Sequence, residues 1–190
     1  LNLGGFMKKK LLFLLLFVAT FSCGKTNKES KSSDKTVNNK NVKIEVSEKV
    51  EVLRKGSEKT GYVTLTKDWE IVHRQEGEVE VIIFENSKKK EEYITLMQNT
   101  TDIYDINSMA LSAYEKLTRN EEDAKYVKKL KESTLNGKKS IQLETNYPNE
   151  TAVKNYTEHN GKIYMIEVAG PKESIETLFN IVNQTWNPDR

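Results

Sequence analysis

The side chains that could perform acid–base, nucleophilic or metal chemistry are few and scattered in this 190-residue sequence. There are two histidines, His73 and His159, and a single cysteine, Cys23. Zinc requires three or four close Cys, His or carboxylate ligands, and no such set is spaced for it here. No serine stands in the context of a nucleophile elbow. We therefore predict no catalytic residue, no cofactor and no metal site, and a protein that is not an enzyme.

The two histidines have separate sequence contexts. His73 follows the strand expected around Trp69, with Glu76 three residues further on. His159 precedes an Asn-Gly pair, which is typical of a tight hairpin turn, so we expect its ring to be solvated. An active site dispersed along the sequence remains the alternative, and it would need His73 beside a carboxylate and a hydroxyl.

The acidic residues have a simpler structural interpretation. Glu78 and Glu80 fall on one face of an expected strand, and we expect that face to be solvated. Residues 121–123 are three successive acids without the spacing of a calcium-binding loop. The two tryptophans, Trp69 and Trp186, fall in a strand and in a helical apolar stripe, so both are expected in the core.

Cys23 carries the clearest chemical prediction. Lys8–Lys10 form a positively charged segment and Leu11–Phe21 an apolar run, which together are the two parts of an export signal. The run is short for a membrane-spanning helix, which needs roughly 20 apolar residues. With Ser22 before it and Gly24 after it, the cysteine resembles the lipobox of bacterial lipoproteins, so lipidation of Cys23 is expected. Ordinary signal-peptidase cleavage, which would leave a free N-terminal cysteine, is the alternative.

These assignments divide the chain into four parts. Residues 1–6 are expected to be an extension upstream of the true start, and residues 7–22 a lipoprotein signal peptide. Residues 23–58 are expected to hold the lipidated cysteine and a flexible polar tether, with a possible edge strand over residues 42–54. Residues 59–190 are expected to form the globular domain. Removal of the signal takes away three lysines and lowers the net charge from +2 to about −1, which argues against a nucleic-acid partner.

Hydrophobic periodicity predicts an α+β domain. The apolar stripe of residues 102–117 predicts a helix whose first turn is capped by Asp102 or Asp105. A second helix is expected to begin with Pro171 at its first position. Residues 120–134 suit either a helix or a strand. Strands are expected over residues 61–65, 78–84, 93–97, 127–135, 139–147, 152–158 and 162–169, with a polar hairpin loop over residues 86–92.

Two Asn-Gly pairs predict the arrangement of the last strands. Asn136-Gly137 and Asn160-Gly161 are typical of type I′ hairpins. With a turn at residues 148–150 between them, the last four strands are expected to form an antiparallel meander. The strand at residues 162–169 is apolar on both faces, which predicts a central position. The expected architecture is therefore an antiparallel sheet, a meander with hairpins, sandwiched by helices.

Four short segments follow one another in a distinctive order: GYVTLTKDW, YITLMQNT, LNGKKSIQLE and HNGKIYMIEVAGP. In this order, over residues 61–186, the chain resembles bacterial lipoproteins with the PsbP-like (Mog-like) α/β/α sandwich. The resemblance implies an antiparallel sheet between helices, and binding or assembly rather than catalysis. It provides no catalytic motif that could be assigned to particular residues.

The sequence thus predicts a membrane-anchored, extracytoplasmic lipoprotein that acts as a binding or assembly module. Its expected partners are the membrane, through the lipid anchor, and a protein or small ligand of unknown identity. An envelope hydrolase and a self-associating structural envelope protein are the alternatives. Gly24, in place of the Asp associated with inner-membrane retention, favours the outer membrane if the cell has two membranes.

Overall fold

The computed structural model describes residues 51–99 and 105–189, and the folded unit begins at Val52. The predicted extension, the signal peptide, Cys23 and the tether up to residue 50 lie outside the described residues. Strand β1 (Val52–Ser57) pairs antiparallel with β2 (Gly61–Thr66) in a two-stranded sheet. The folded domain therefore starts at Val52 rather than at residue 59.

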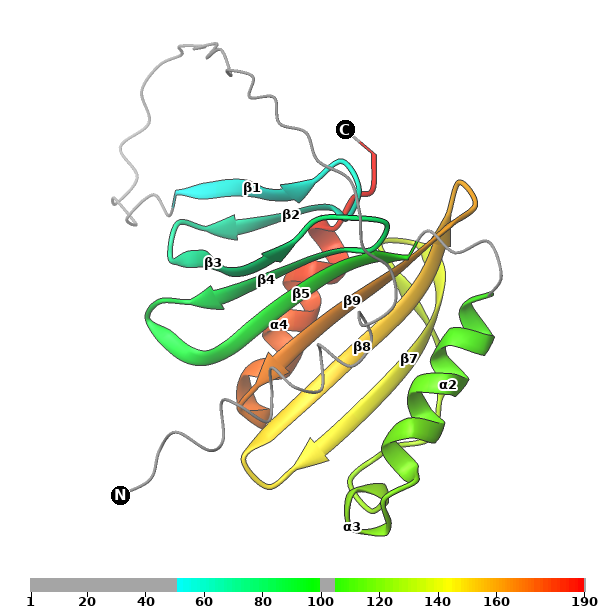
Figure 1. Ribbon diagram of the computed structural model, residues 1–190. Helices are drawn as coiled ribbons and strands as arrows, with labels where there is room; N and C mark the ends of the chain where they lie inside the picture. The colour runs from blue at the N-terminus through cyan, green and yellow to red at the C-terminus, as the bar shows by residue number, and fades with distance from the viewer. Residues whose placement is uncertain (1–50, 100–104, 190) are drawn as a thin grey trace, which may run out of the picture. The chain divides into compact units, whose positions relative to one another are not determined.

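The main sheet is antiparallel throughout, and its strand order is β3-β4-β5-β9-β8-β7-β6 (Figure 1). The predicted meander of the last four strands is confirmed, and β9 is central, as its apolar residues on both faces indicated. Both Asn-Gly turns have the positive φ angles of type I′ hairpins, for example 47° at Asn136 and 74° at Gly137. The strands are β3 (Trp69–Gln75), β4 (Glu80–Asn86), β5 (Lys89–Asn99), β6 (Lys131–Leu135), β7 (Lys138–Tyr147), β8 (Glu150–His159) and β9 (Lys162–Gly170).

The described helices are α2 (Ile106–Thr118), α3 (Glu121–Ala124) and α4 (Lys172–Thr185). Asp105 caps α2, because its side chain accepts a hydrogen bond from the backbone N–H of Ser108 at 2.8 Å. Pro171 precedes α4 as its N-cap residue, so the predicted first helical position was wrong by one residue. The ambiguous stretch of residues 120–134 contains both α3 and the start of β6. The expected hairpin loop of residues 86–92 is only a turn at residues 87–88.

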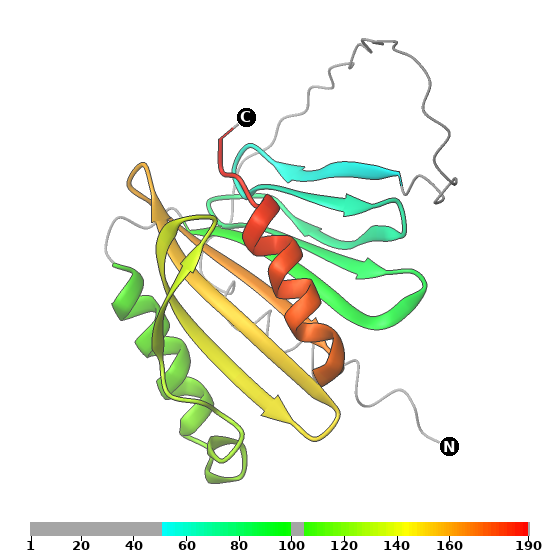
Figure 2. The same ribbon diagram turned by 180° about the vertical axis from the view of Figure 1, so that it is seen from behind.

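Helices pack on both faces of the main sheet. Helix α4 contacts β8 and β9 and lies in front of the sheet in Figure 2, whereas α2 packs against β7 and β8 from the other side (Figures 1 and 2). The core under α4 includes Trp69, Phe84 and Trp186, so both tryptophans are buried as predicted. This cluster contains none of the buried residues of α2, which confirms two apolar layers around one sheet. No helix within the described ranges is long and apolar enough to cross a membrane.

Candidate functional site

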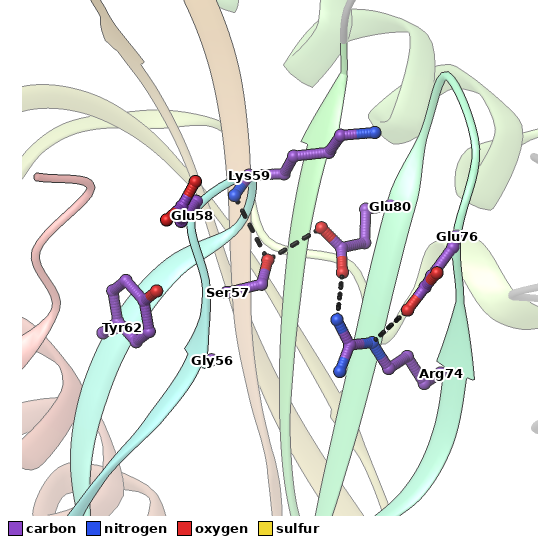
Figure 3. Close-up of a pocket in the computed structure, with 8 residues that line it drawn as sticks. All are labelled: Gly56, Ser57, Glu58, Lys59, Tyr62, Arg74, Glu76 and Glu80. Carbon is purple, nitrogen blue, oxygen red and sulfur yellow. Dashed lines mark hydrogen bonds and ion pairs between the residues drawn. The ribbon is translucent and has the colours of Figure 1, made fainter. Parts of the chain in front are cut away.

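An open hollow of about 410 Å³ lies between the β1–β2 hairpin and the end of β3 with the start of β4 (Figure 3). The hairpin contributes Gly56–Lys59 and Tyr62 to its lining. The main sheet contributes Arg74, Glu76 and Glu80. The two-stranded sheet of β1 and β2 is separate from the main sheet. Side-chain hydrogen bonds connect the two sheets across this hollow.

Glu80 is the central group of the hollow. Its side chain belongs to a residue only 3% exposed, and both carboxylate oxygens are bonded. Ser57 Oγ donates to one oxygen at 2.7 Å, and Arg74 Nη2 donates to the other at 3.1 Å. The Nε of Arg74 lies 3.0 Å from a carboxylate oxygen of Glu76, so one guanidinium joins two acids. Burying a carboxylate is costly unless charged and hydrogen-bonding groups surround it, and Ser57 and Arg74 provide such groups here.

The local backbone orients Ser57 toward Glu80. Ser57 Oγ accepts the backbone N–H groups of Lys59 and Thr60 at 3.2 and 3.1 Å, which fixes the hydroxyl within the turn. Gly56, just before it, has φ 138°, and a Cβ there would lie 2.1 Å from the carbonyl oxygen of Gly61. Only glycine allows the two strands to approach so closely at this point.

The predicted solvated face at Glu78 and Glu80 was wrong for Glu80. Glu78 is exposed and precedes β4, whereas Glu80 is the first residue of that strand. The sequence did hold a signal for its burial. Successive residues of a strand alternate between faces, so Glu80 must share a face with Ile82 and Phe84, both fully buried core residues.

The histidines do not meet in the fold. His73 is half-buried on β3, opposite Ile83, and is not among the residues lining the hollow. His159 lies at the end of β8, which is separated from β3 by three strands in the sheet order. The hollow therefore contains a hydroxyl and a carboxylate, but the acid–base histidine of a triad does not line it.

His159 was expected to be solvated, and this prediction was wrong. Its side chain is 17% exposed and lies between two charged groups. One ring nitrogen is 2.8 Å from Asp189 Oδ1, and the other is 3.0 Å from Lys138 Nζ. The Asn-Gly turn forms as expected, but the chain beyond α4 returns across it and covers the ring.

A second charged pair lies on the α2 side of the sheet. Lys154 on β8 is 3.4 Å from Glu167 on β9, and the register places the two residues directly opposite. Burial alone would lower the pKa of Lys154, but the charge and hydrogen bond of Glu167, together with Tyr156 and Tyr147, raise this pKa above its ordinary value. Burial also raises the pKa of the neighbouring Tyr156 to about 12. No group of three or more His, Cys, Asp or Glu side chains that could hold a metal occurs among the described residues.

Most of the large exposed apolar side chains belong to strands β1 and β3. Of the five large exposed apolar side chains in the described part of the chain, four belong to these two strands. We call Val52, Leu53, Ile71 and Val72 the apolar rim; they are 42% to 56% exposed. The fifth, Leu111, lies on α2.

The rim lies on strands whose edges are protected against pairing with another strand. The Lys55 ammonium of β1 donates to the carbonyl oxygen of Trp69, which occupies one backbone acceptor of β3. The register of β3 shifts between Ile71 and His73, and such a bulge disturbs the regular edge. Inward-pointing lysines and bulges are common devices that block edge-to-edge association. The rim therefore offers side chains, rather than a regular backbone edge, to a partner.

Comparisons with known proteins support the fold. No protein-family model and no curated protein matches the chain. Among solved structures, it is similar to the solution structure of cyanobacterial PsbP (CyanoP) from Synechocystis sp. PCC 6803, with a TM-score of 0.51. The match is 11% identical and covers 76% of this chain and 96% of that chain. At this identity the likeness establishes a PsbP-like fold, as the sequence patterns predicted.

Proposed function

We propose that this protein is a lipid-anchored envelope module that binds a partner protein through the apolar rim. The observation that carries the proposal is the concentration of exposed aliphatic side chains on β1 and β3. Scattered single apolar residues are ordinary on a protein surface, but a grouped set often marks an interaction site. Val52 and Leu53, two of the four rim residues, are the first residues of the folded unit.

The charged residues of β1 beside the apolar rim favour a different protein, rather than a second copy of this chain, as the binding partner. Two copies would associate most simply by pairing β1 with β1 about a twofold axis. In the central registers this would place either Arg54 or Lys55 opposite its own equivalent, and like charges directly opposite are destabilising. A partner with an apolar surface patch suits the exposed aliphatic groups without this repulsion.

The anchor rests on the sequence around Cys23, which follows an apolar run as in bacterial lipoproteins. Lipidation would hold the module at a membrane outside the cytoplasm, with the outer membrane favoured in a two-membrane cell. We expect Cys23→Ala to lose incorporation of labelled fatty acid and to leave the membrane fraction. Label that persists in this variant would contradict the anchor, without bearing on the rim.

We infer a non-catalytic role, because Glu80, Arg74 and Glu76 bind one another and no histidine lines the hollow. The envelope hydrolase remains the less supported alternative. It predicts that Ser57→Ala abolishes an activity while leaving partner capture intact.

The test of the rim is crosslinking of the full chain in intact membranes, followed by identification of captured proteins. Replacing both Ile71 and Val72 by lysine should lower the yield of the specific partner about tenfold or more, because burying each aliphatic group stabilises a complex by about 1.5–3 kcal/mol. Leu111→Lys is the matched control, since it changes an equally exposed apolar residue away from the rim. Equal capture by the rim variant, or equal loss in the control, would contradict the proposal. A captured second copy would instead support self-association.

A further inference from the structure

The residues that follow α4 connect the β1–β2 hairpin with the main sheet. We call residues 186–189 the C-terminal strap. Asn187 exchanges two backbone hydrogen bonds with Tyr62 on β2, both of 2.8 Å. The carbonyl oxygen of Asp189 accepts a hydrogen bond from Arg54 Nη2 on β1 at 2.6 Å. The strap therefore lies along the hairpin, and whatever holds the strap to the main sheet also holds the hairpin there.

His159 joins the side chain of the strap to the main sheet. Its Nε2 lies 2.8 Å from Asp189 Oδ1, and its Nδ1 lies 3.0 Å from Lys138 Nζ. An ammonium has three donors and no acceptor, so Nδ1 must accept from Lys138. The ring proton is therefore on Nε2 and is donated to the carboxylate of Asp189, which makes this ring a neutral imidazole.

The charged groups around the ring come from four elements. They are Lys138 of β7, Glu158 of β8, Lys162 of β9, which is opposite His159 in the register, and Asp189 of the strap. Asn160, which is uncharged, places its Nδ2 3.1 Å from Nε2. Among the charged side chains of the described residues, only Lys138 and Asp189 are bonded to the ring, so these two decide how it responds to a proton.

Protonation of His159 affects its two charged neighbours in opposite ways. Histidine is the side chain whose charge ordinarily changes between about pH 5 and 8. A protonated ring has N–H groups at both nitrogens, so the ammonium of Lys138 loses its acceptor and meets a like charge. Asp189 keeps its hydrogen bond and gains an opposite charge, and such charge-assisted bonds are roughly twice as strong as neutral ones.

We propose that His159 is a pH-sensitive switch that holds the C-terminal strap. Acidification releases Lys138 and tightens the contact with Asp189, and with it the attachment of the β1–β2 hairpin to the main sheet. The direction follows from reciprocity: because the carboxylate attracts the proton, the bound proton attracts the strap. The effect develops between about pH 8 and 5 and is lost near pH 4, where aspartate itself becomes protonated.

The expected size of the effect is modest, because 58% of the Asp189 side chain is exposed. Ion pairs at such positions change an equilibrium by about twofold to fivefold. The inference does not rest on the proposed function, since it concerns only how the hairpin is attached to the rest of the fold.

The backbone amides of Tyr62 and Asn187 report on the strap directly, because they form the two hydrogen bonds between it and β2. Hydrogen exchange of the full chain in detergent is followed by NMR at pH 5.5 and 7.5, and each rate is divided by that of an unstructured chain at the same pH. We expect protection of both amides to be about twofold to fivefold greater at pH 5.5. The amide of Lys128, bonded to the carbonyl oxygen of Glu144 at 2.9 Å, is the internal control and should be equally protected at both values.

Four variants test the residues. His159→Gln should abolish the difference between the two pH values, whereas His73→Gln, at the other histidine, should keep it. Asp189→Asn retains an acceptor but removes the charge, so it should also abolish the difference. Lys138→Met should keep the tightening and move its midpoint to higher pH, because the cation that opposes protonation is gone.

Equal protection of the Tyr62 and Asn187 amides at the two pH values would overturn the proposal. A difference that survives in His159→Gln or Asp189→Asn would contradict it, as would an equal change at Lys128, which would indicate a change in the stability of the whole fold. If His159→Gln fails to fold, Asp189→Asn decides, since it alters a mostly exposed side chain. Failure of the rim test would leave all of these results as they are.

Discussion

The indole Nε1 of Trp186 donates a hydrogen bond to the backbone carbonyl of Thr60 at 3.2 Å, across 126 residues of sequence. Both residues are fully buried, and the same indole packs edge-on against the ring of Tyr164 with centroids 5.3 Å apart. The residue after the last helix therefore holds the first hairpin against the main sheet.

Replacing Trp186 by phenylalanine should lower the free energy of unfolding by about 2–4 kcal/mol, because it leaves a cavity and a buried carbonyl without its donor. Urea denaturation followed by far-UV circular dichroism measures this change. Trp69→Phe, at a buried position of the same cluster, is the control and should cost less. Equal losses in the two variants would show that the bond to Thr60 contributes little.

Two glycines with nearly the same φ should respond differently to alanine. Gly61 has φ 75°, and a Cβ there would lie 2.8 Å from Trp186 Nε1. Gly137 has φ 74°, but a Cβ there would meet nothing within 4 Å. Gly137→Ala should therefore cost only the left-handed backbone strain of about 1–2 kcal/mol.

Gly61→Ala should cost clearly more than Gly137→Ala, since the indole and the neighbouring backbone must move as well. The two midpoints of urea unfolding, with equal slopes, give the difference directly. A Gly61→Ala variant as stable as Gly137→Ala would mean that the chain beyond α4 adjusts without loss.

Stability should fall at alkaline pH because of Tyr156. Its pKa is raised to about 12 in the folded state, mainly by burial, against 10 for an unperturbed tyrosine. The unfolded chain therefore loses this proton first as the pH rises above 10, which favours unfolding between pH 10 and 12. The loss reaches about 3 kcal/mol from this one residue. Urea midpoints measured from pH 8 to 11 should decline, and less steeply in Tyr156→Phe; an unchanged slope in that variant would contradict the assignment.

Replacing only one member of the Lys154–Glu167 pair should lower the stability of the fold more than replacing both. Lys154→Met leaves a largely buried carboxylate without its partner and should cost about 3–5 kcal/mol. The double variant Lys154→Met with Glu167→Leu should recover most of that stability. Because the pKa of Lys154 is raised on folding, the pair stabilises the fold below pH 10 and loses its effect as the pH rises through that pKa. A double variant no more stable than the single one would show that the pair is not needed as a unit.

The sequence predicted those parts of the fold that depend on local signals. The Asn-Gly pairs at 136 and 160 are such signals, because their turn type depends on residues that tolerate positive φ. Asp105 caps α2 for a similarly local reason. The positions that were mispredicted depend instead on segments distant in sequence. His159 is covered by Asp189, and Glu80 is bonded to Ser57 on another sheet.

The residues of the hollow also depend on segments distant in sequence, which limited their prediction. Ser57 was assigned to the tether, since a short polar strand has no apolar pattern to distinguish it from a flexible segment. Its partner Glu80 stood beside three apolar neighbours and could have been placed in the interior by alternation alone. Alternation along β4 could not identify Ser57 as the partner of Glu80, because β1 and β4 are joined through side chains.

The register of β1 against β2 also determines how the folded unit would respond to a mechanical load. Val52 pairs with Thr66 at the open end of the hairpin, and Ser57 pairs with Gly61 at its turn. A pull on the chain before Val52 acts at the open end, so the backbone bonds would break one after another, as in unzipping, rather than all together as in shear. The first strand can thus yield at low force while the seven-stranded sheet beneath it stays intact.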